Sequence, residues 1–271
     1  LGAPVMGVRG AALATLISRM AEAAVMLAYI LAVDDRLKLR LKHFLESDGE
    51  LRRDFIRCGA PIIGGQIVWS VNMMTNSAIL GRFTEEVMTA ASVANTMNSL
   101  AYVCMNGMSS AVSVITGKTV GEGRVAQMKE YARTVQLLFL GLGLLTGGMI
   151  ALLRAPFISL YAGITPQARL YSMQFILVLS VTMIGTCYQA ACLAGLVKAG
   201  GDVDFVFKND AIFVFLVVLP SAFIAARLGA APWVVFALLK SDQILKCFVA
   251  VVKINRFDWI RNLTRGDAAT Q

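Results

Sequence analysis

The sequence predicts an all-α transmembrane protein with seven membrane-spanning helices. Apolar residues make up 57% of the 271 positions and charged residues only 15%, whereas a soluble domain carries about a quarter charged residues. The apolar residues gather in long runs, each close to the length needed to cross a hydrocarbon core of about 30 Å. These runs are 7–33, 57–80, 88–117, 131–153, 170–197, 211–228 and 232–253. Seven such runs cannot all be buried in one soluble domain, so we expect lipid to surround most of the chain.

The positions of the positive charges predict how the runs are oriented. Of the 25 Lys and Arg residues, 17 fall in the segments 34–57, 118–133, 198–208 and 253–271, and five fall in the connections on the opposite side. Because positive charge marks cytoplasmic loops, we expect the C-terminus to be cytoplasmic in a multi-pass protein of the plasma membrane. The net charge of +8 then follows from topology, and we expect no nucleic-acid partner.

Catalytic and metal-binding residues are scarce in this sequence. The one histidine, His43, lies in a charged segment, and the five cysteines lie in or beside apolar runs without metal-ligand spacing. Neither a Ser-His-Asp set nor a Cys-His pair is therefore expected. The sequence predicts no enzymatic activity, no metal site and no bound cofactor.

Charged residues inside the runs are the first candidates for a functional site, because a charge at mid-bilayer is costly and usually faces the interior of a bundle. Arg19 and Glu22 are three residues apart in the first run, so they share one helix face and can pair. Asp242 and Lys246 are four apart in the last run and can pair likewise. Two interpretations stay open: ion pairs that hold one helix against its neighbour, or charges that move in a transport cycle or bind a cation.

Amide and aromatic side chains inside the runs form a second group of candidates. They are Gln66, Trp69, Asn72 and Asn76 in the second run, Asn95 and Asn98 in the third, and Tyr188 and Gln189 in the fifth. A buried amide without a partner costs roughly 1–3 kcal/mol, so these groups either hydrogen-bond between helices or line a watery cavity. In the second case Trp69 and Tyr188 offer flat surfaces to a cationic or aromatic substrate.

Several short motifs, taken together, resemble one transporter family. They include CGAP at 58–61, VITGKTVGEG at 114–123, LVKAGGD at 196–202 and WIRNLT at 259–264. In this order, the four motifs resemble the seventh helix, the loop after helix eight, the turn after helix ten and the C-terminal ending of MATE (multidrug and toxic compound extrusion) transporters. The stretch 10–22 resembles the sixth helix of the same family. The resemblance covers nearly the whole chain.

This resemblance implies a fold of two six-helix lobes around a central cavity. The chain is then expected to be a fragment: 1–33 is the last helix of the N-terminal lobe, 34–56 a basic inter-lobe loop, 57–253 the C-terminal lobe and 254–271 a cytoplasmic tail. Its expected partners are the lipid bilayer, the N-terminal lobe of the same protein, and small cationic or aromatic substrates.

The resemblance also implies export of cationic drugs or metabolites, driven by the entry of Na⁺ or H⁺. Many relatives carry an acid at the position of Gln66, and glutamine cannot titrate. Ion coupling is therefore expected to use Asp242, Glu22 or an acid in the N-terminal lobe.

Three other functions are compatible with a helical membrane protein. A flippase for lipid-linked oligosaccharides needs a strongly basic cavity to hold a pyrophosphate, and only Arg19, Lys240 and Lys246 are available inside the runs. A membrane-embedded enzyme needs acids or histidines clustered at an interface. A non-transporting membrane subunit needs no charges inside its helices, so the in-span charges argue against it.

Overall fold

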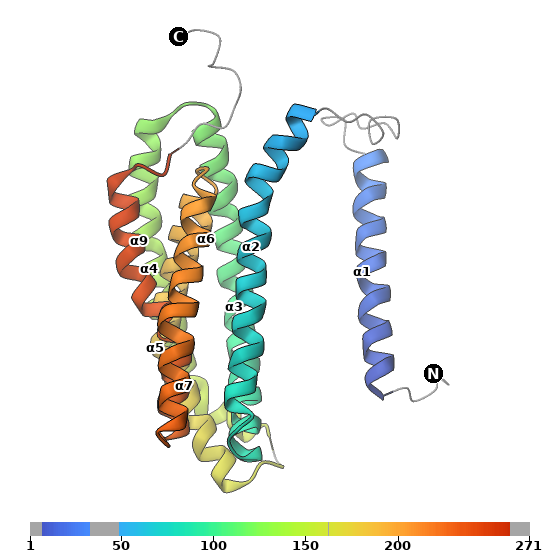
Figure 1. Cartoon of the computed structure of the whole chain (residues 1–271), viewed down its shortest axis with the longest axis vertical. Coiled ribbons are helices and arrows are strands. Elements are labelled where there is room, and N and C mark those ends of the chain that lie inside the picture. Colours follow the sequence, from blue (N-terminus) through green and yellow to red (C-terminus); the bar gives the residue numbers. More distant parts are fainter. Residues whose placement is uncertain (1–6, 33–48, 162, 261–271) are drawn as a thin grey trace. The chain divides into compact units, whose positions relative to one another are not determined.

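The computed structural model describes residues 7–32, 49–161 and 163–260, and within these segments all regular structure is helical (Figure 1). The predicted basic loop up to residue 48, with His43, and the tail beyond Ile260 lie outside the described residues. The helices in chain order are α1 (Gly7–Ala32), α2 (Gly49–Leu80), α3 (Glu85–Gly121), α4 (Val125–Ser159), α5 (Pro166–Gln189), η2 (Ala190–Lys198), α6 (Val203–Ile212), η3 (Phe213–Val218), α7 (Leu219–Arg227), α8 (Pro232–Leu239) and α9 (Asp242–Arg256).

The chain divides into two compact units. The first unit, Leu1–Arg57, contains α1, and the second, Cys58–Gln271, contains the helical bundle. In the second unit α5 and its continuation η2 are central, because they pack against α3, α4, α8 and α9. In the most apolar stretch of this central span, 67% of the residues are buried. The corresponding share is 22% in each of the three spans Glu85–Gly121, Val125–Ser159 and Val203–Arg227.

The predicted all-α transmembrane class is confirmed. Among the described residues, five helical stretches are long and apolar enough to cross a membrane: Ala12–Ile30, Glu85–Gly121, Val125–Ser159, Pro166–Lys198 and Val203–Arg227. The two other predicted runs are also helical. The second run lies in α2, which carries the amides, and the last run is split into α8 and α9. Seven membrane-spanning helices are compatible with this pattern.

The helices extend beyond the predicted runs at most of their ends. α4 begins at Val125 and ends at Ser159, whereas the apolar run covers 131–153, and α2 begins at Gly49, inside the segment predicted as a loop. The prediction ended each run where charged residues begin. A helix continues past the hydrocarbon boundary because its backbone hydrogen bonds do not depend on lipid, so hydropathy locates spans better than helix ends.

Three spans of the bundle depart from regular α-helix. α5 passes into the π-helical segment η2, α6 passes through the π-helical segment η3 into α7, and the last run is interrupted at Lys240–Ser241. Pro220 is the second residue of α7, just after η3. Because proline has no N–H, the hydrogen bond back to Leu216 cannot form, which favours a wider turn there. π-helical turns inside α-helices are frequently found at functional sites.

Glycines on α4 allow it to approach α5 closely. A Cβ atom placed on Gly143 would lie 2.9 Å from the carbonyl oxygen of Ile184, and one on Gly147 would press against the carbonyl oxygen of Ser180. Both obstacles are backbone atoms, which cannot move aside as a side chain can. This spacing of small residues brings two membrane helices into backbone contact.

Substitution Gly147→Ala should therefore destabilise the protein. The added methyl group would push α4 away from α5, and overpacking of this kind costs about 1–3 kcal/mol. Thermal unfolding in detergent, followed by size-exclusion chromatography, measures the change. Gly148→Ala is the matched control, because a Cβ atom at Gly148 meets nothing within 4 Å. Equal melting temperatures for the two variants would contradict the close contact.

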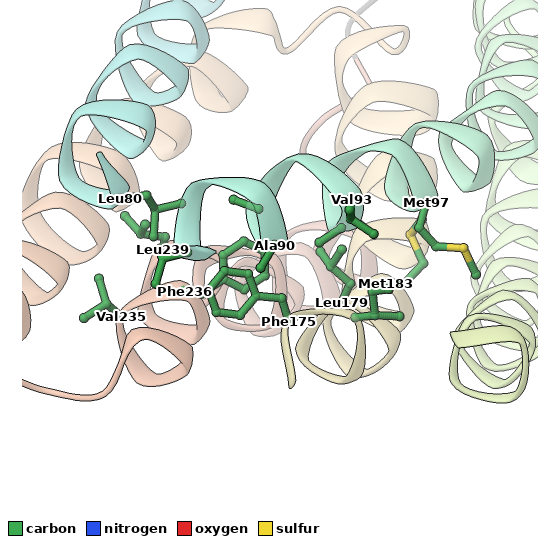
Figure 2. Close-up of a cluster of buried hydrophobic side chains, with 14 of the residues drawn as sticks. Leu80, Ala90, Val93, Met97, Phe175, Leu179, Met183, Val235, Phe236 and Leu239 are labelled. Atoms are coloured by element: carbon green, nitrogen blue, oxygen red, sulfur yellow. The ribbon is translucent and has the colours of Figure 1, made fainter. Parts of the chain in front are cut away.

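Two clusters of buried apolar side chains stabilise the bundle. The first joins α2, α3, α5 and α8 (Figure 2), and at its centre the rings of Phe175 and Phe236 are stacked, 4.3 Å apart and within 2° of parallel. The second cluster includes Phe139, Leu196 and Trp259. Along the last run, residues of the first cluster end at Leu239 and those of the second begin at Ala250. The interval between them is where polar side chains enter the bundle.

Candidate functional site

A cavity of about 220 Å³ opens within the second unit, between α2, α3, the junction of α5 with η2, α6, and the break between α8 and α9. The two π-helical segments and the helix break all contribute to its wall. Its polar lining includes four of the predicted amide and aromatic candidates: Trp69, Asn72, Asn76 and Gln189. The structure therefore brings together residues that lie far apart in the sequence.

An ion cluster forms one side of the cavity. The Nζ atom of Lys246 lies 2.9 Å from Oδ1 of Asp210 and 3.1 Å from Oδ2 of Asp242. Asp242 is 3% exposed and Lys246 is 5% exposed, whereas the side chain of Asp210 is 33% exposed, so this largely buried cluster joins α6 to α9. The predicted contact between Asp242 and Lys246 is present.

Asp210 was not among the predicted site residues. It stands one residue before the apolar run 211–228 and therefore lies outside the runs in which charged residues were considered. A signal was available in the spacing. Val206, Asp210 and Val214 are four residues apart on one helical face, and all three line the cavity.

A chain of hydrogen bonds connects α5 to the ion cluster through Gln243. The hydroxyl of Thr186 donates to Oε1 of Gln243 at 3.1 Å, and the amide of Gln189 donates to the same oxygen. Nε2 of Gln243 in turn donates to Oδ2 of Asp242 at 3.0 Å. Sequence analysis missed Gln243, although it is the neighbour of a predicted residue. The predicted hydrogen-bonding role of Gln189 is present.

Three hydrogen-bond acceptors in the cavity wall have no donor among the described residues. The Oδ1 atoms of Asn72, Asn76 and Asp242 are buried and have no hydrogen-bond partner among the described residues. All three residues line the cavity. A buried acceptor without a donor costs about 1–3 kcal/mol. The wall therefore suits a guest that carries positive charge or N–H groups.

Two further cavities adjoin this one along α2. Asn95 lines a cavity of about 430 Å³ that shares Asn76 and Lys240 with the first. Gln66 lines a third, of about 510 Å³, that shares Trp69 and Asp210 with the first. Trp69, which is 57% exposed, thus separates two cavities and presents its ring to both. Asn98 lines none of the three.

Tyr188, and the ion pair of Arg19 with Glu22 on α1, make other contacts. The buried hydroxyl of Tyr188 donates to Oε1 of Gln136 at 2.7 Å, and the ring lines an apolar groove beside α9 instead of the polar cavity. Arg19 and Glu22 form the predicted ion pair, with 2.7 Å between Nη1 and Oε2. Both side chains of this pair are exposed within the first unit.

Serine side chains satisfy carbonyl groups where α5 changes to π-helix. The hydroxyl of Ser109 donates to the carbonyl oxygen of Ala190 at 3.0 Å, and that of Ser113 donates to the carbonyl oxygen of Ala194 at 3.3 Å. The two serines are four residues apart on α3, and the two alanines are four residues apart on η2. One face of α3 therefore packs along one face of η2. These bonds stabilise the distorted segment that forms part of the cavity wall.

No group of three or more His, Cys, Asp or Glu residues is placed to hold a metal ion in the parts of the chain that the structure describes.

Comparison with known proteins identifies the family. The sequence profile of the MatE family matches residues 61–224, which is more than half of the chain and runs from within α2 to within α7. The chain belongs to the MatE family. This membership agrees with the resemblance to MATE transporters. It also agrees with a multi-pass membrane protein, as the long apolar helices indicate.

Two named relatives are similar to this MatE chain. "Probable multidrug resistance protein YoeA" of Bacillus subtilis (strain 168) is 23% identical over 232 residues, which are 83% of this chain and 49% of the relative. "Probable multidrug resistance protein NorM" of Thermotoga maritima is 27% identical over 160 residues, which are 59% of this chain and 34% of the relative. The chain thus spans half or less of the length of both.

Solved structures share the fold. A MATE crystallised in complex with MaL6 superposes with a TM-score of 0.74 at 20% identity, over 93% of this chain and 58% of that one. An outward-facing multidrug resistance MATE transporter of the MOP superfamily superposes with a TM-score of 0.67 at 19% identity, over 95% and 58% of the two chains. The helical arrangement is therefore that of MATE transporters.

Proposed function

We propose that this chain is part of a secondary active multidrug exporter, which binds its substrate in a central cavity and exchanges it for Na⁺ or H⁺. The observation that carries the proposal is the buried ion cluster beside an acceptor-rich cavity in a membrane-spanning bundle. A charge inside the membrane is costly and usually serves transport. The names of the two relatives, both multidrug resistance proteins, support the same function.

The bundle from Cys58 to Ile260 forms, in this proposal, one lobe of a two-lobe transporter, with α1 as the last helix of the other lobe. The match to 58% of each solved transporter supports this arrangement. The end of the bundle that carries Lys198, Lys253 and Arg256 faces the cytoplasm, as positive charge favours. The remaining partners are the bilayer and the first lobe.

Within the cavity we assign two roles. Trp69, with Asn72 and Asn76 on the same helix, contacts a cationic or aromatic substrate through its ring and the amide oxygens. Asp242 binds the coupling Na⁺ or H⁺. Its Oδ2 atom contacts Lys246 and Gln243, while its Oδ1 atom has no partner within the described chain and is available to the ion. Glu22 on α1 remains a second candidate for coupling.

Substitution Asp242→Asn tests this assignment in the full protein. Export of a fluorescent cationic dye from proteoliposomes, driven by an imposed Na⁺ or pH gradient, should fall about tenfold or more, which is the scale of a typical coupling free energy. Folding should persist, because asparagine keeps the shape and can still accept a bond from Lys246. Asp204→Asn is the matched control, since Asp204 is exposed on α6 outside the cavity. Unchanged export would remove Asp242 from the coupling mechanism.

The charge of the cavity also bears on the flippase alternative. Two carboxylates, Asp210 and Asp242, face two lysines, Lys240 and Lys246. A site for a pyrophosphate requires a clear excess of positive charge. The balanced lining favours export of cationic or neutral molecules.

A further inference from the structure

We propose that Lys246 is a tethered counter-cation, whose ammonium group occupies the site of a transported alkali cation and is displaced when that cation binds. This inference rests on the proposed function and concerns its ion site. The ammonium group lies between one carboxylate from α6 and one from α9. A free cation entering the cavity would meet the same two carboxylates and would have to compete with this built-in charge.

The seam between α6 and α9 holds two such lysines, which allows a comparison. Seven residues along α9, about two helical turns, Nζ of Lys253 lies 2.8 Å from Oδ2 of Asp202 and 3.0 Å from Oδ1 of Asp258. Lys253 therefore also bridges two carboxylates. Its ammonium group, however, lies 4.5 Å from the centre of the Phe205 ring, and the residue does not line the cavity. The outer lysine therefore lies outside the cavity, while the inner one is part of its lining.

The inner site offers oxygen atoms that Lys246 leaves unused. Oδ1 of Asp242 has no hydrogen-bond partner within the described residues, although the side chain is almost fully buried. The unpartnered Oδ1 atoms of Asn72 and Asn76 line the same cavity. Carboxylate and amide oxygens are the ligands that hard cations prefer. An amide oxygen does not bind a proton near neutral pH, so this set of oxygens favours Na⁺ over H⁺.

Charge balance explains why Lys246 would be exchangeable. Asp210 and Asp242 are balanced by Lys240 and Lys246 in the cavity lining, so an incoming cation must displace an ammonium group from a carboxylate instead of adding to it. An ammonium group is compact, strongly hydrated and carried on a flexible stem, and it can keep its contact with Asp210 while it leaves Asp242. The incoming ion would take the place at Asp242. The lysine thus lowers the apparent affinity for the ion by the fraction of time it occupies that place.

Equilibrium binding of ²²Na⁺ to the purified full protein tests the proposal, with choline chloride holding the ionic strength constant. Lys246→Met removes the competitor, so Na⁺ should bind about tenfold or more tightly than to the wild type. Lys246→Arg keeps the charge and should leave the affinity within about twofold of the wild type. Lys253→Met is the matched control, because it removes the other bridging lysine and should leave Na⁺ affinity unchanged.

An unchanged or weaker Na⁺ affinity of folded Lys246→Met would overturn the proposal, as would equal tightening in Lys253→Met. If Lys246→Met does not fold, the double variant Lys246→Met/Asp210→Asn removes one charge of each sign, so it keeps the net charge of the cavity lining, and it must show the same tightening. Failure of the proposed export function is recognised separately. In that case Na⁺ binding would still respond to Lys246→Met, while no dye would be exported by the wild type.

Discussion

Substitution Gly185→Ala should both destabilise the protein and reduce its export activity about tenfold or more. A Cβ atom at Gly185 would press against the carbonyl oxygen of Gln243 and would lie 2.9 Å from its carbonyl carbon and 3.2 Å from Cα of Ile244. All three atoms belong to the backbone at the start of α9, directly after the helix break. The start of α9 must therefore move away from α5, and misplacement of a functional group by about 1 Å can reduce activity 100-fold.

The displacement would separate groups that the candidate site needs together. Gln243 accepts hydrogen bonds from Thr186 and Gln189 and donates one to Asp242. A shift of its backbone weakens this link, and overpacking itself costs about 1–3 kcal/mol. Thermal unfolding and gradient-driven dye export measure the two effects. Gly107→Ala on α3 is the control, since a Cβ atom there meets nothing within 4 Å; a Gly185→Ala protein with the activity and melting temperature of this control would refute the close contact.

Substitution Trp259→Ala should have the largest effect on stability. Trp259 is fully buried, and its indole N–H donates to the carbonyl oxygen of Ile254 at 3.2 Å. Its ring packs against Gly200, where a Cβ atom would collide with it. Removal of a buried tryptophan side chain costs about 3–5 kcal/mol. Trp259, the first residue of the WIRNLT motif, therefore packs against Gly200 of the LVKAGGD motif. Loss of this contact should lower the melting temperature in detergent.

Two further variants separate the contribution of Trp259 from general effects of losing an aromatic ring. Trp259→Phe keeps most of the apolar contact and should recover part of the stability. Trp233→Ala removes a tryptophan that is 45% exposed and should lower the melting temperature much less. If Trp233→Ala and Trp259→Ala were equally stable, the contact between the two motifs would not hold the end of the bundle together.

Local contacts in the candidate site could be predicted from the sequence. Arg19 with Glu22, and Asp242 with Lys246, form ion pairs at the spacings of three and four residues that place them on one helix face. Such pairs depend only on helical periodicity. The predicted amides Gln66, Asn72 and Asn76 all lie on α2, because polar side chains inside an apolar run are visible without knowledge of the fold.

Contacts between helices could not be predicted in the same way. Tyr188 and Gln189 are neighbours in the sequence, yet Gln189 reaches Gln243 at the cavity while Tyr188 reaches Gln136 on α4. Which of the two faces the cavity depends on the rotation of α5 about its axis. Asp210 joined the cluster for the same reason, since the rotation of α6 turns its carboxylate towards Lys246.

The sequence by itself determined that this chain is a helical membrane protein, because long apolar runs are stable only in lipid and carry that information residue by residue. It also determined the family, through motifs spread along nearly the whole chain. Only the tertiary structure decided that the last run breaks at Lys240–Ser241 and that Asp210, Asp242 and Lys246 share one cavity. Those features depend on how closely neighbouring helices pack and at what rotation, and hydropathy along one chain does not record either.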